Sequence, residues 1–217
     1  MEVDYDIVIC TTAVSRSELH KEVFPRYLIF LEGLRCKWYI NIDQIEGEES
    51  QITKAELTSI LNNSLIDLHI NINNIGGSRE SFYRSAQYLV NLAKETIPKF
   101  GYLWLEDDWR YYGNVTLKNY LNEIIFKSKD YLQLVTRNKE LSFNPSVYGI
   151  ELFNNVIVKG LAKEFTPDNA NPERACTYPP SESIKLVEAH YTLPAFKDVG
   201  RDWTQSKGIW RTFQKKS

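Results

Sequence analysis

The sequence predicts an α/β fold in which a mostly parallel sheet is flanked by helices. Through the first half of the chain, apolar segments of strand length alternate with segments of helical periodicity. The run Gly101-Tyr102-Leu103-Trp104-Leu105 is continuously apolar, as parallel strands are when helices cover both faces of the sheet. A chain of 217 residues can bury one sizeable core, so we expect a single domain, 1–217.

The first half divides into four strands and three helices. Strands are predicted at residues 5–11, 36–42 and 66–72 and from 101 to the acidic residues that follow, and helices at 16–34, 53–61 and 81–94. Pro25 marks an early position or a kink in the first helix. Thr53 and Glu56 form a capping box that is expected to begin the second helix. This alternation implies parallel strands joined by right-handed crossovers.

The second half of the chain is less regular. We expect a strand at 131–136, a turn and then a strand or short helix at 143–153, a loop around one helical turn at 166–180, and a strand at 184–187. A basic tail with two tryptophans follows at 196–213. We therefore divide the domain into a regular half, 1–113, and a less regular half, 114–217.

Composition narrows the classes of partner and compartment. The net charge of −2 gives no argument for binding nucleic acid or an anionic membrane surface. Thirteen tyrosines and five tryptophans suit stacking on bases or sugar rings, but aromatic residues are also ordinary core material. The three cysteines lack metal-ligand spacing, and we find neither a leader nor an apolar stretch of bilayer length. We expect a cytoplasmic protein without a membrane span.

Three adjacent carboxylates, Glu106, Asp107 and Asp108, end the strand that begins at Gly101. They repel one another, and a hard cation bound by carboxylate oxygens would relieve that repulsion. Residues two apart on a strand face the same side, so Glu106 and Asp108 are placed to converge on one ion. The alternative is an acidic loop that caps the next helix.

Polar residues also follow the other predicted strands. Thr11 and Thr12 end the first strand with Arg16 nearby, and Asp43 follows the second. The carboxyl ends of parallel strands share one edge, where open α/β sheets bind ligands. We therefore expect a ligand site at this edge.

A glycine pair lies after the third strand. Gly76 and Gly77 would let the backbone approach a ligand, the helix that follows favours an anion, and Arg79 would contact a phosphate. A plain Gly-rich turn capped by Ser78 is the alternative. The chain lacks the Gly-Lys-Ser/Thr of a P-loop and a G-x-G-x-x-G after the first strand, which argues against a dinucleotide dehydrogenase.

Together these residues resemble the GT-A family of nucleotide-sugar glycosyltransferases. The matching residues are the Thr11-Thr12 strand end, Asp43, and the Glu106-Asp107-Asp108 segment as a variant of the D-x-D motif. The resemblance implies a GT-A-like, Rossmann-like sheet, a nucleotide-sugar donor for which a UDP-sugar is expected, a glycan or glycoprotein acceptor, and Mn²⁺ or Mg²⁺. It makes 1–113 the nucleotide-sugar-binding half and 114–217 the acceptor half.

A narrower resemblance is to the compact, capsid-decorating glycosyltransferase domains of large algal viruses. It rests on chain length, on the sequence EDDW, and on Asp198-Val199-Gly200-Arg201. It implies a protein of the host cytoplasm.

The resemblance to the GT-A family also implies roles for individual residues. The Thr11-Thr12 end and Asp43 would hold uracil and ribose, and Asp107 would lie near the ribose or a metal-bound water. Asp108 would bind the metal directly, with His190 as a late histidine ligand. A structural histidine beside a strand is the alternative for His190, and His20 and His69 are interpreted as structural.

An inverting transferase needs a carboxylate base that takes the proton of the acceptor hydroxyl. Glu173 is the candidate base, and a first-turn glutamate that favours the helix dipole is the alternative. Lys197, Arg201 and Lys207 would close over the diphosphate or form a solvated basic tail. Two other functions remain open, a nucleotidyltransferase and a non-catalytic nucleotide- or sugar-binding module.

Overall fold

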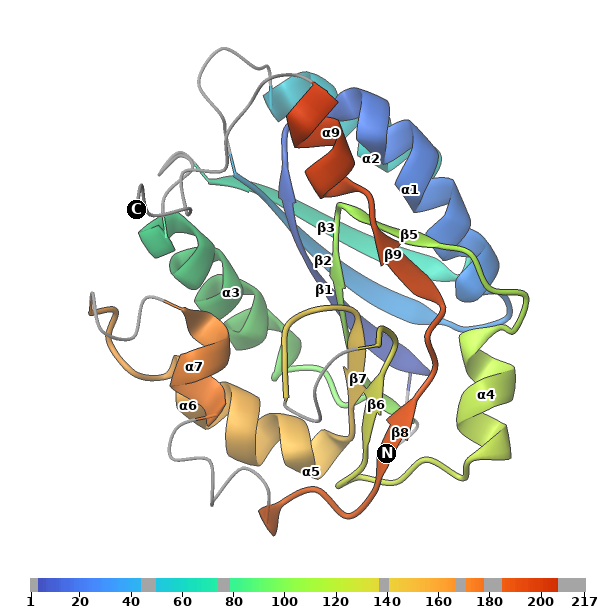
Figure 1. The fold of residues 1–217 in the computed structure, drawn as a ribbon, viewed down its shortest axis with the longest axis vertical. Coiled ribbons are helices and arrows are strands. Elements are labelled where there is room, and N and C mark those ends of the chain that lie inside the picture. Colours follow the sequence, from blue (N-terminus) through green and yellow to red (C-terminus); the bar gives the residue numbers. More distant parts are fainter. Residues whose placement is uncertain are drawn as a thin grey trace.

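A computed structural model describes residues 4–43, 50–73, 79–136, 141–166, 171–177 and 185–206. Within these residues seven strands form the central sheet, in the order β3-β2-β1-β4-β7-β6-β8 (Figure 1). Their bounds are β1 (Ile7–Val14), β2 (Cys36–Asp43), β3 (Ile66–Asn73), β4 (Gly101–Glu106), β6 (Tyr131–Gln133), β7 (Ser146–Tyr148) and β8 (His190–Thr192). A small second sheet pairs β5 (Trp109–Tyr111) with β9 (Phe196–Asp198).

The first four strands confirm the predicted parallel sheet. β1 pairs in parallel with β2 and with β4, and β2 pairs in parallel with β3. The helices between them are α1 (Ser17–Phe30), α2 (Ser50–Ile60) and α3 (Arg79–Ala93). β1 is therefore a central strand, with the chain winding outward through β2 and β3 before it returns to β4.

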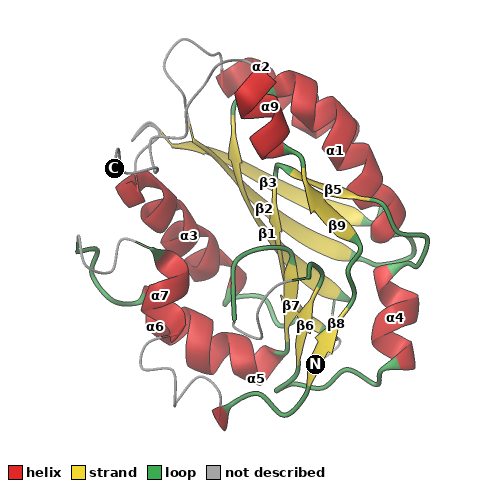
Figure 2. Cartoon of the chain, in the orientation of Figure 1, coloured by secondary structure: helices red, strands yellow, loops and turns green. Residues whose placement is uncertain are grey.

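Helices cover both faces of the sheet (Figure 2). On one face α1 and α2 pack around Trp38, in a core that also takes Leu117 and Leu121 from α4 (Leu117–Glu123). On the other face α3 packs around Trp104 together with helical segments from the second half. Those segments are α5 (Ile150–Leu152), the π-helix η1 (Phe153–Val158), α6 (Lys159–Leu161) and α7 (Pro172–Thr177), and the last described helix is α9 (Gly200–Ser206).

The second half of the chain completes the same sheet rather than forming one of its own. β7 is antiparallel to β4 and to β6, and β8 then adds in parallel to β6, so the sheet is mixed on this side. Segment 143–153 contains both of the expected alternatives, a strand followed by a helix. None of the described helices is both long and apolar enough to cross a membrane.

Two predictions about local structure are wrong. Helix α2 begins at Ser50, so Thr53 lies inside the helix and is buried instead of capping it. The Ser50 hydroxyl lies 3.2 Å from that of Ser15, and this tertiary contact belongs to a first turn that the capping-box pattern missed. The described residues of segment 184–187 form no strand, and the edge strand instead begins at His190, where β6 offers a partner.

Candidate functional site

The candidate site lies where the direction of winding reverses, between β1 and β4. Thr12 of β1 is in register with Glu106 of β4, so the carboxylate segment lies beside the last residues of β1, which ends at Val14. Ligands of open α/β sheets bind at this kind of topological switch point. The predicted acidic turn therefore occupies the position at which the fold favours a ligand.

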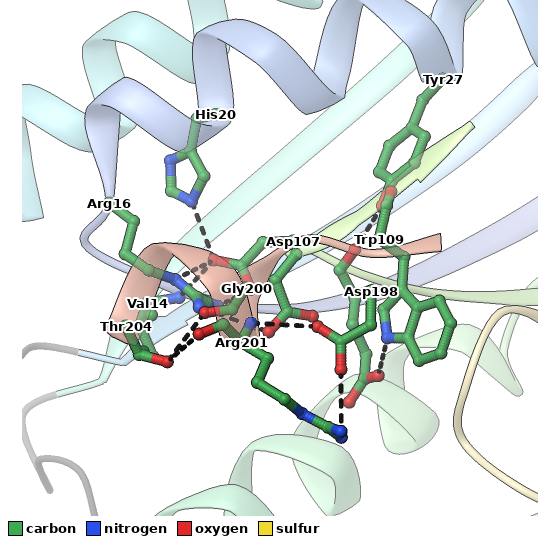
Figure 3. Close-up of polar contacts among 12 residues, drawn as sticks. Val14, Arg16, His20, Tyr27, Asp107, Trp109, Asp198, Gly200, Arg201 and Thr204 are labelled. Atoms are coloured by element: carbon green, nitrogen blue, oxygen red, sulfur yellow. Dashed lines mark hydrogen bonds and ion pairs between the residues drawn. The ribbon is translucent and has the colours of Figure 1, made fainter. Parts of the chain in front are cut away.

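Hydrogen bonds from side chains fix the turn at residues 106–109 (Figure 3). The buried Tyr27 hydroxyl of α1 lies 2.5 Å from the carbonyl oxygens of both Glu106 and Trp109, at the two ends of the turn. The indole Nε1 of Trp109 donates to Glu106 Oε2 at 2.7 Å. These contacts make the turn part of the rigid core rather than a mobile loop.

Asp107 points toward the start of α1. Its Oδ2 accepts from the Val14 amide at 3.0 Å, from Arg16 Nε at 3.3 Å and from His20 Nε2 at 2.8 Å, and its Oδ1 accepts from Arg16 Nη2 (Figure 3). Since an ionised carboxylate only accepts, His20 carries its proton on Nε2. Asp107 is 2% exposed, Arg16 7% and His20 1%, so this is a buried ion-pair cluster.

The charges of this cluster balance inside the protein. Burial by itself would raise the pKa of Asp107, but the Arg16 guanidinium and the His20 hydrogen bond more than offset it and lower the pKa to about 2. Burial lowers the pKa of Arg16, and Asp107 and Asp108 outweigh that effect and raise it. Asp107 and Arg16 thus bind each other, whereas the sequence analysis expected both to contact a donor or a metal.

Glu106 faces the opposite side of the sheet, with Trp104 and Tyr102, because side chains alternate along β4. Burial raises its pKa well above the usual value, and the nearby carboxylates of Asp108 and Glu173 raise it further. The Trp109 hydrogen bond opposes that rise. The charged form of Glu106 is therefore disfavoured on this side, in contrast to that of Asp107 in the cluster on the other side.

Asp108 lies between these two environments and is 8% exposed. Its Oδ2 is 3.3 Å from Arg16 Nη1, and its carbonyl accepts from the amides of Val199 and Gly200 at 2.8 and 3.2 Å. The C-terminal strand and helix thus cover the acidic turn. No group of three or more His, Cys, Asp or Glu in the described parts of the chain is arranged to hold a metal ion.

A cation that arrives with a diphosphate does not need such a group. Mg²⁺ is typically held by one or two carboxylates, with phosphate oxygens and water as the other ligands. Asp108 supplies one carboxylate, and the mutual repulsion of Glu106, Asp108 and Glu173 favours a positive charge nearby. The residues present therefore fit a cation carried on a diphosphate, and they do not form a preformed protein cage.

The residues at the ends of β1 and β2 separate by face. The Thr11 hydroxyl is fully buried and accepts from Trp38 Nε1 at 2.9 Å, so it belongs to the core rather than to a ligand site. Thr12 alternates to the α3 face, which it shares with Glu106 and Asp43. Burial raises the pKa of Asp43, against the opposing hydrogen bonds from Ser81 and Ser85.

Asp43 ends a chain of side-chain hydrogen bonds between the sheet and α3. Asn71 Nδ2 donates to Asn41 Oδ1 at 2.7 Å, Asn41 Nδ2 donates to Ser85 Oγ at 2.7 Å, and Ser85 Oγ donates to Asp43 Oδ1 at 3.4 Å. These contacts hold the Asp43 carboxylate near the β2 end of the candidate site.

His190 and Asp108 lie far apart. His190 pairs with Tyr131 at the start of β8, and Tyr131 is level with Tyr102 across β7, well before the end of β4. β8 is three strands from β4, a separation of roughly 14 Å across the sheet alone. The structure therefore does not bring His190 to the acidic turn, because the strand order places it at the edge of the sheet.

Glu173 lies in the first turn of α7, on the same side of the sheet as Glu106. Its Oε1 accepts from the Phe143 amide at 2.9 Å and from Asn144 Nδ2 at 3.3 Å. These bonds tie α7 to the segment before β7 and orient the carboxylate. The structure brings Glu173 into the electrostatic neighbourhood of Glu106, although the two lie in different halves of the chain.

Several predicted site residues fall outside the described structure or on its surface. Gly76, Gly77, Lys207 and the Arg79 side chain lie outside the described residues. Lys197 and Arg201 are exposed, and Arg201 pairs with Asp198 at 3.6 Å.

Three residues of the site were not identified from the sequence. His20 binds Asp107, Tyr27 holds the turn, and Gly200 packs against Asp108. His20 and Tyr27 lie seven residues apart in α1, a spacing that places both on one helix face, but apolar neighbours made that face look like ordinary core. The Asp198–Arg201 motif was the only sequence signal near Gly200.

No protein-family model matches the sequence, and no curated protein matches it. Among solved structures, a mannosyltransferase from Pyrobaculum calidifontis in complex with GDP-Man and Mn²⁺ is similar, with a TM-score of 0.53 and 12% identity. That alignment covers 86% of this chain and 54% of the mannosyltransferase, so the chain spans about half the length of that protein.

Two further structures show weaker similarity. Mouse xyloside xylosyltransferase 1 has a TM-score of 0.44 at 10% identity and covers 87% of this chain and 85% of its own. Core-mannan synthase A from Aspergillus fumigatus, in an Mn/GDP form, has a TM-score of 0.31 at 8% identity over 58% and 41%. Nothing here supports a viral origin. The likeness to the mannosyltransferase shows that this chain has the GT-A type of α/β fold.

Proposed function

We propose that this protein is a glycosyltransferase that moves a sugar from a nucleoside diphosphate to a hydroxyl group of a glycan or glycoprotein. One observation carries the proposal. Glu106 and Asp108 lie at the topological switch point, in a turn that α1 and the C-terminal segment hold rigid. The GT-A type of fold supports the same conclusion, because the mannosyltransferase that shares it was solved with GDP-Man and Mn²⁺.

In the nucleotide-sugar half, 1–113, each carboxylate would have a different role. Asp43 and Thr12 would contact the nucleoside from the α3 face. Asp108 would hold a Mn²⁺ or Mg²⁺ ion that arrives with the donor. When bound, that ion would offset the negative charge of the departing diphosphate. Asp107, which is bonded to Arg16 and His20, would position the turn rather than contact the donor.

The acceptor half, 114–217, supplies Glu173. The Phe143 amide donates to its Oε1 and holds the carboxylate in place, where it would act as the base for the acceptor hydroxyl. Its position near Glu106 supports this role, since donor and acceptor must meet at the end of β4. A base at Glu173 is required only if the reaction inverts the configuration of the sugar.

Calorimetric titration of UDP and of GDP, each with Mn²⁺ and with EDTA, tests the proposal. We expect UDP, the nucleotide that the sequence resemblance implies, to bind more tightly with Mn²⁺, and Asp108→Asn to abolish the difference between Mn²⁺ and EDTA. Asp202→Asn, on the exposed side of α9, is the matched control and should bind like the wild type. Equal affinity with Mn²⁺ and EDTA in the wild type would remove the metal from the proposal.

A screen of nucleotide sugars for hydrolysis then separates the three functions. Release of free sugar with a nucleoside diphosphate supports the transferase. In a parallel assay, release of pyrophosphate when a nucleoside triphosphate is incubated with a sugar phosphate would indicate a nucleotidyltransferase. Binding of the nucleotide without turnover of any donor would indicate a binding module.

A further inference from the structure

The C-terminal segment, from β9 to α9, is tied directly to the acidic turn. β9 pairs with β5 so that Asp198 lies opposite Trp109. The next two amides, of Val199 and Gly200, both donate to the carbonyl of Asp108, at 2.8 and 3.2 Å. Two consecutive donors on one carbonyl fix the backbone of Asp108 relative to the start of α9.

Gly200 also touches the side chain of Asp108. A Cβ added to Gly200 would lie 2.2 Å from Asp108 Oδ2, 2.4 Å from its Cβ and 2.6 Å from its Cγ, all shorter than real carbon contacts allow. Gly200 is not among the glycines with positive φ, so the backbone conformation there does not require glycine. Space beside Asp108 is therefore what requires it.

We propose that Gly200 is a positioning residue that keeps the Asp108 carboxylate in its place at the donor site. The lack of a side chain at position 200 leaves room for the Asp108 carboxylate beside the start of α9. Any larger residue must displace Asp108 or the start of α9, because both backbones are held by the hydrogen bonds described above. The effect on ligand binding rests on the proposed function, whereas the packing of Gly200 on Asp108 does not.

Thermal unfolding of a double-mutant cycle tests the packing without any ligand. Gly200→Ala should lower the Tm of the wild type by several degrees. In an Asp108→Gly background, which removes all three clashing atoms, the same change should leave the Tm unchanged or raise it, since alanine favours a helix more than glycine does. An equal fall in Tm in both backgrounds would overturn the proposed contact.

Nucleotide binding tests the positioning. In the calorimetric assay with Mn²⁺ and UDP or GDP, Gly200→Ala should weaken binding at least about tenfold, as expected when a ligating group moves by about 1 Å. It should cause no further loss in an Asp108→Gly background, which removes the clashing Cβ together with the carboxylate, because Gly200 acts only through the Asp108 side chain. Asp202→Ala, exposed on the same helix, should bind like the wild type.

The outcomes separate this inference from the proposed function. If the wild type binds no nucleoside diphosphate, the proposed function fails, and the stability cycle still decides whether Gly200 packs on Asp108. If the wild type binds but Gly200→Ala binds equally well, or loses affinity equally in both backgrounds, the positioning role is refuted while the proposed function stands.

Discussion

Asp107 and Glu106 are adjacent carboxylates on opposite faces of the sheet, and their pKa values are shifted in opposite directions. Asp107 lies toward α1, where Arg16 and His20 lower its pKa to about 2. Glu106 lies toward α3 and α7, where burial and the carboxylates of Asp108 and Glu173 raise its pKa. Two adjacent positions thus hold one carboxylate whose charged form the fold favours and one whose charged form the fold disfavours.

Within one acidic motif, Asp107 is bonded to side chains that hold the turn, whereas the environment of Glu106 favours a cation nearby. On the α1 side, Arg16 and His20 compensate the Asp107 carboxylate, so removing one partner would leave a buried charge unpaired. On the α3 side, burial and the nearby carboxylates disfavour the charged form of Glu106, and a bound cation would favour it. A shifted pKa of this kind is typical of functional sites.

The largest expected effect is on the α1 side. Asp107→Asn leaves the Arg16 guanidinium buried with only the longer contact to Asp108, and breaking a buried pair in this way costs about 3–5 kcal/mol. Urea unfolding followed by circular dichroism measures the loss. Asp108→Asn should change stability far less, because Arg16 keeps Asp107. Equal stability of Asp107→Asn and the wild type would show that the cluster does not hold the turn.

The acid limb of the stability curve sharpens the same contrast. An unfolded aspartate has a pKa near 3.9, whereas folded Asp107 has one of about 2. Its stabilising contribution is therefore complete above about pH 4 and is lost as the pH falls toward 2. The Tm of the wild type should fall more steeply over this range than that of Asp107→Asn. Parallel curves for the two proteins would contradict the lowered pKa.

On the α3 side we expect the opposite sign. Glu106→Gln removes a buried carboxylate near Asp108 and Glu173 and keeps an oxygen that accepts from Trp109 Nε1. At neutral pH it should stabilise the fold by about 1 kcal/mol, on the order of a typical single substitution. The same variant should bind the nucleoside diphosphates UDP and GDP less tightly than the wild type. A loss of stability as large as that of Asp107→Asn would break the comparison.

The smallest effect is expected at an exposed pair of the same chemistry. Glu80 and Arg84 pair at 2.7 Å within α3, with side chains 42% and 50% exposed. Glu80→Ala should cost at most about 0.5 kcal/mol, because water screens both charges. Urea unfolding at low and high salt measures it. A cost near that of Asp107→Asn would mean that burial does not set the strength of these pairs.

Much of the fold could be predicted from the sequence because its signals are local. The continuous apolar run at Gly101–Leu105 predicts a strand covered on both faces, and β4 is such a strand. The apolar face of α3 and the strands β1, β2 and β3 follow in the same way from periodicity. Short elements were not predicted where their position depends on pairing with a distant segment. β8 is an example, because it forms where β6 offers a neighbouring strand.

From the sequence, only the position of the candidate site at the carboxyl ends of the strands and its negative charge could be predicted. The sequence indicates three carboxylates at the end of a strand, and parallel strand ends converge whatever the packing details. It does not indicate that Asp107 binds Arg16, that Thr11 bonds to Trp38, or that His190 lies at the edge of the sheet. Each of these depends on partners far away in the sequence.

The mostly parallel α/β sheet and the acidic turn at its ligand edge can be predicted from the order of residues along the chain. Apolar periodicity and the abrupt change to charged residues are local patterns, so they can be recognised without knowledge of the fold. The lowered pKa of Asp107, the raised pKa of Glu106 and the packing of Gly200 against Asp108 all follow from tertiary contacts. Burial and pairing set the energy of a charge, and both are created by chain segments that meet only when the protein folds.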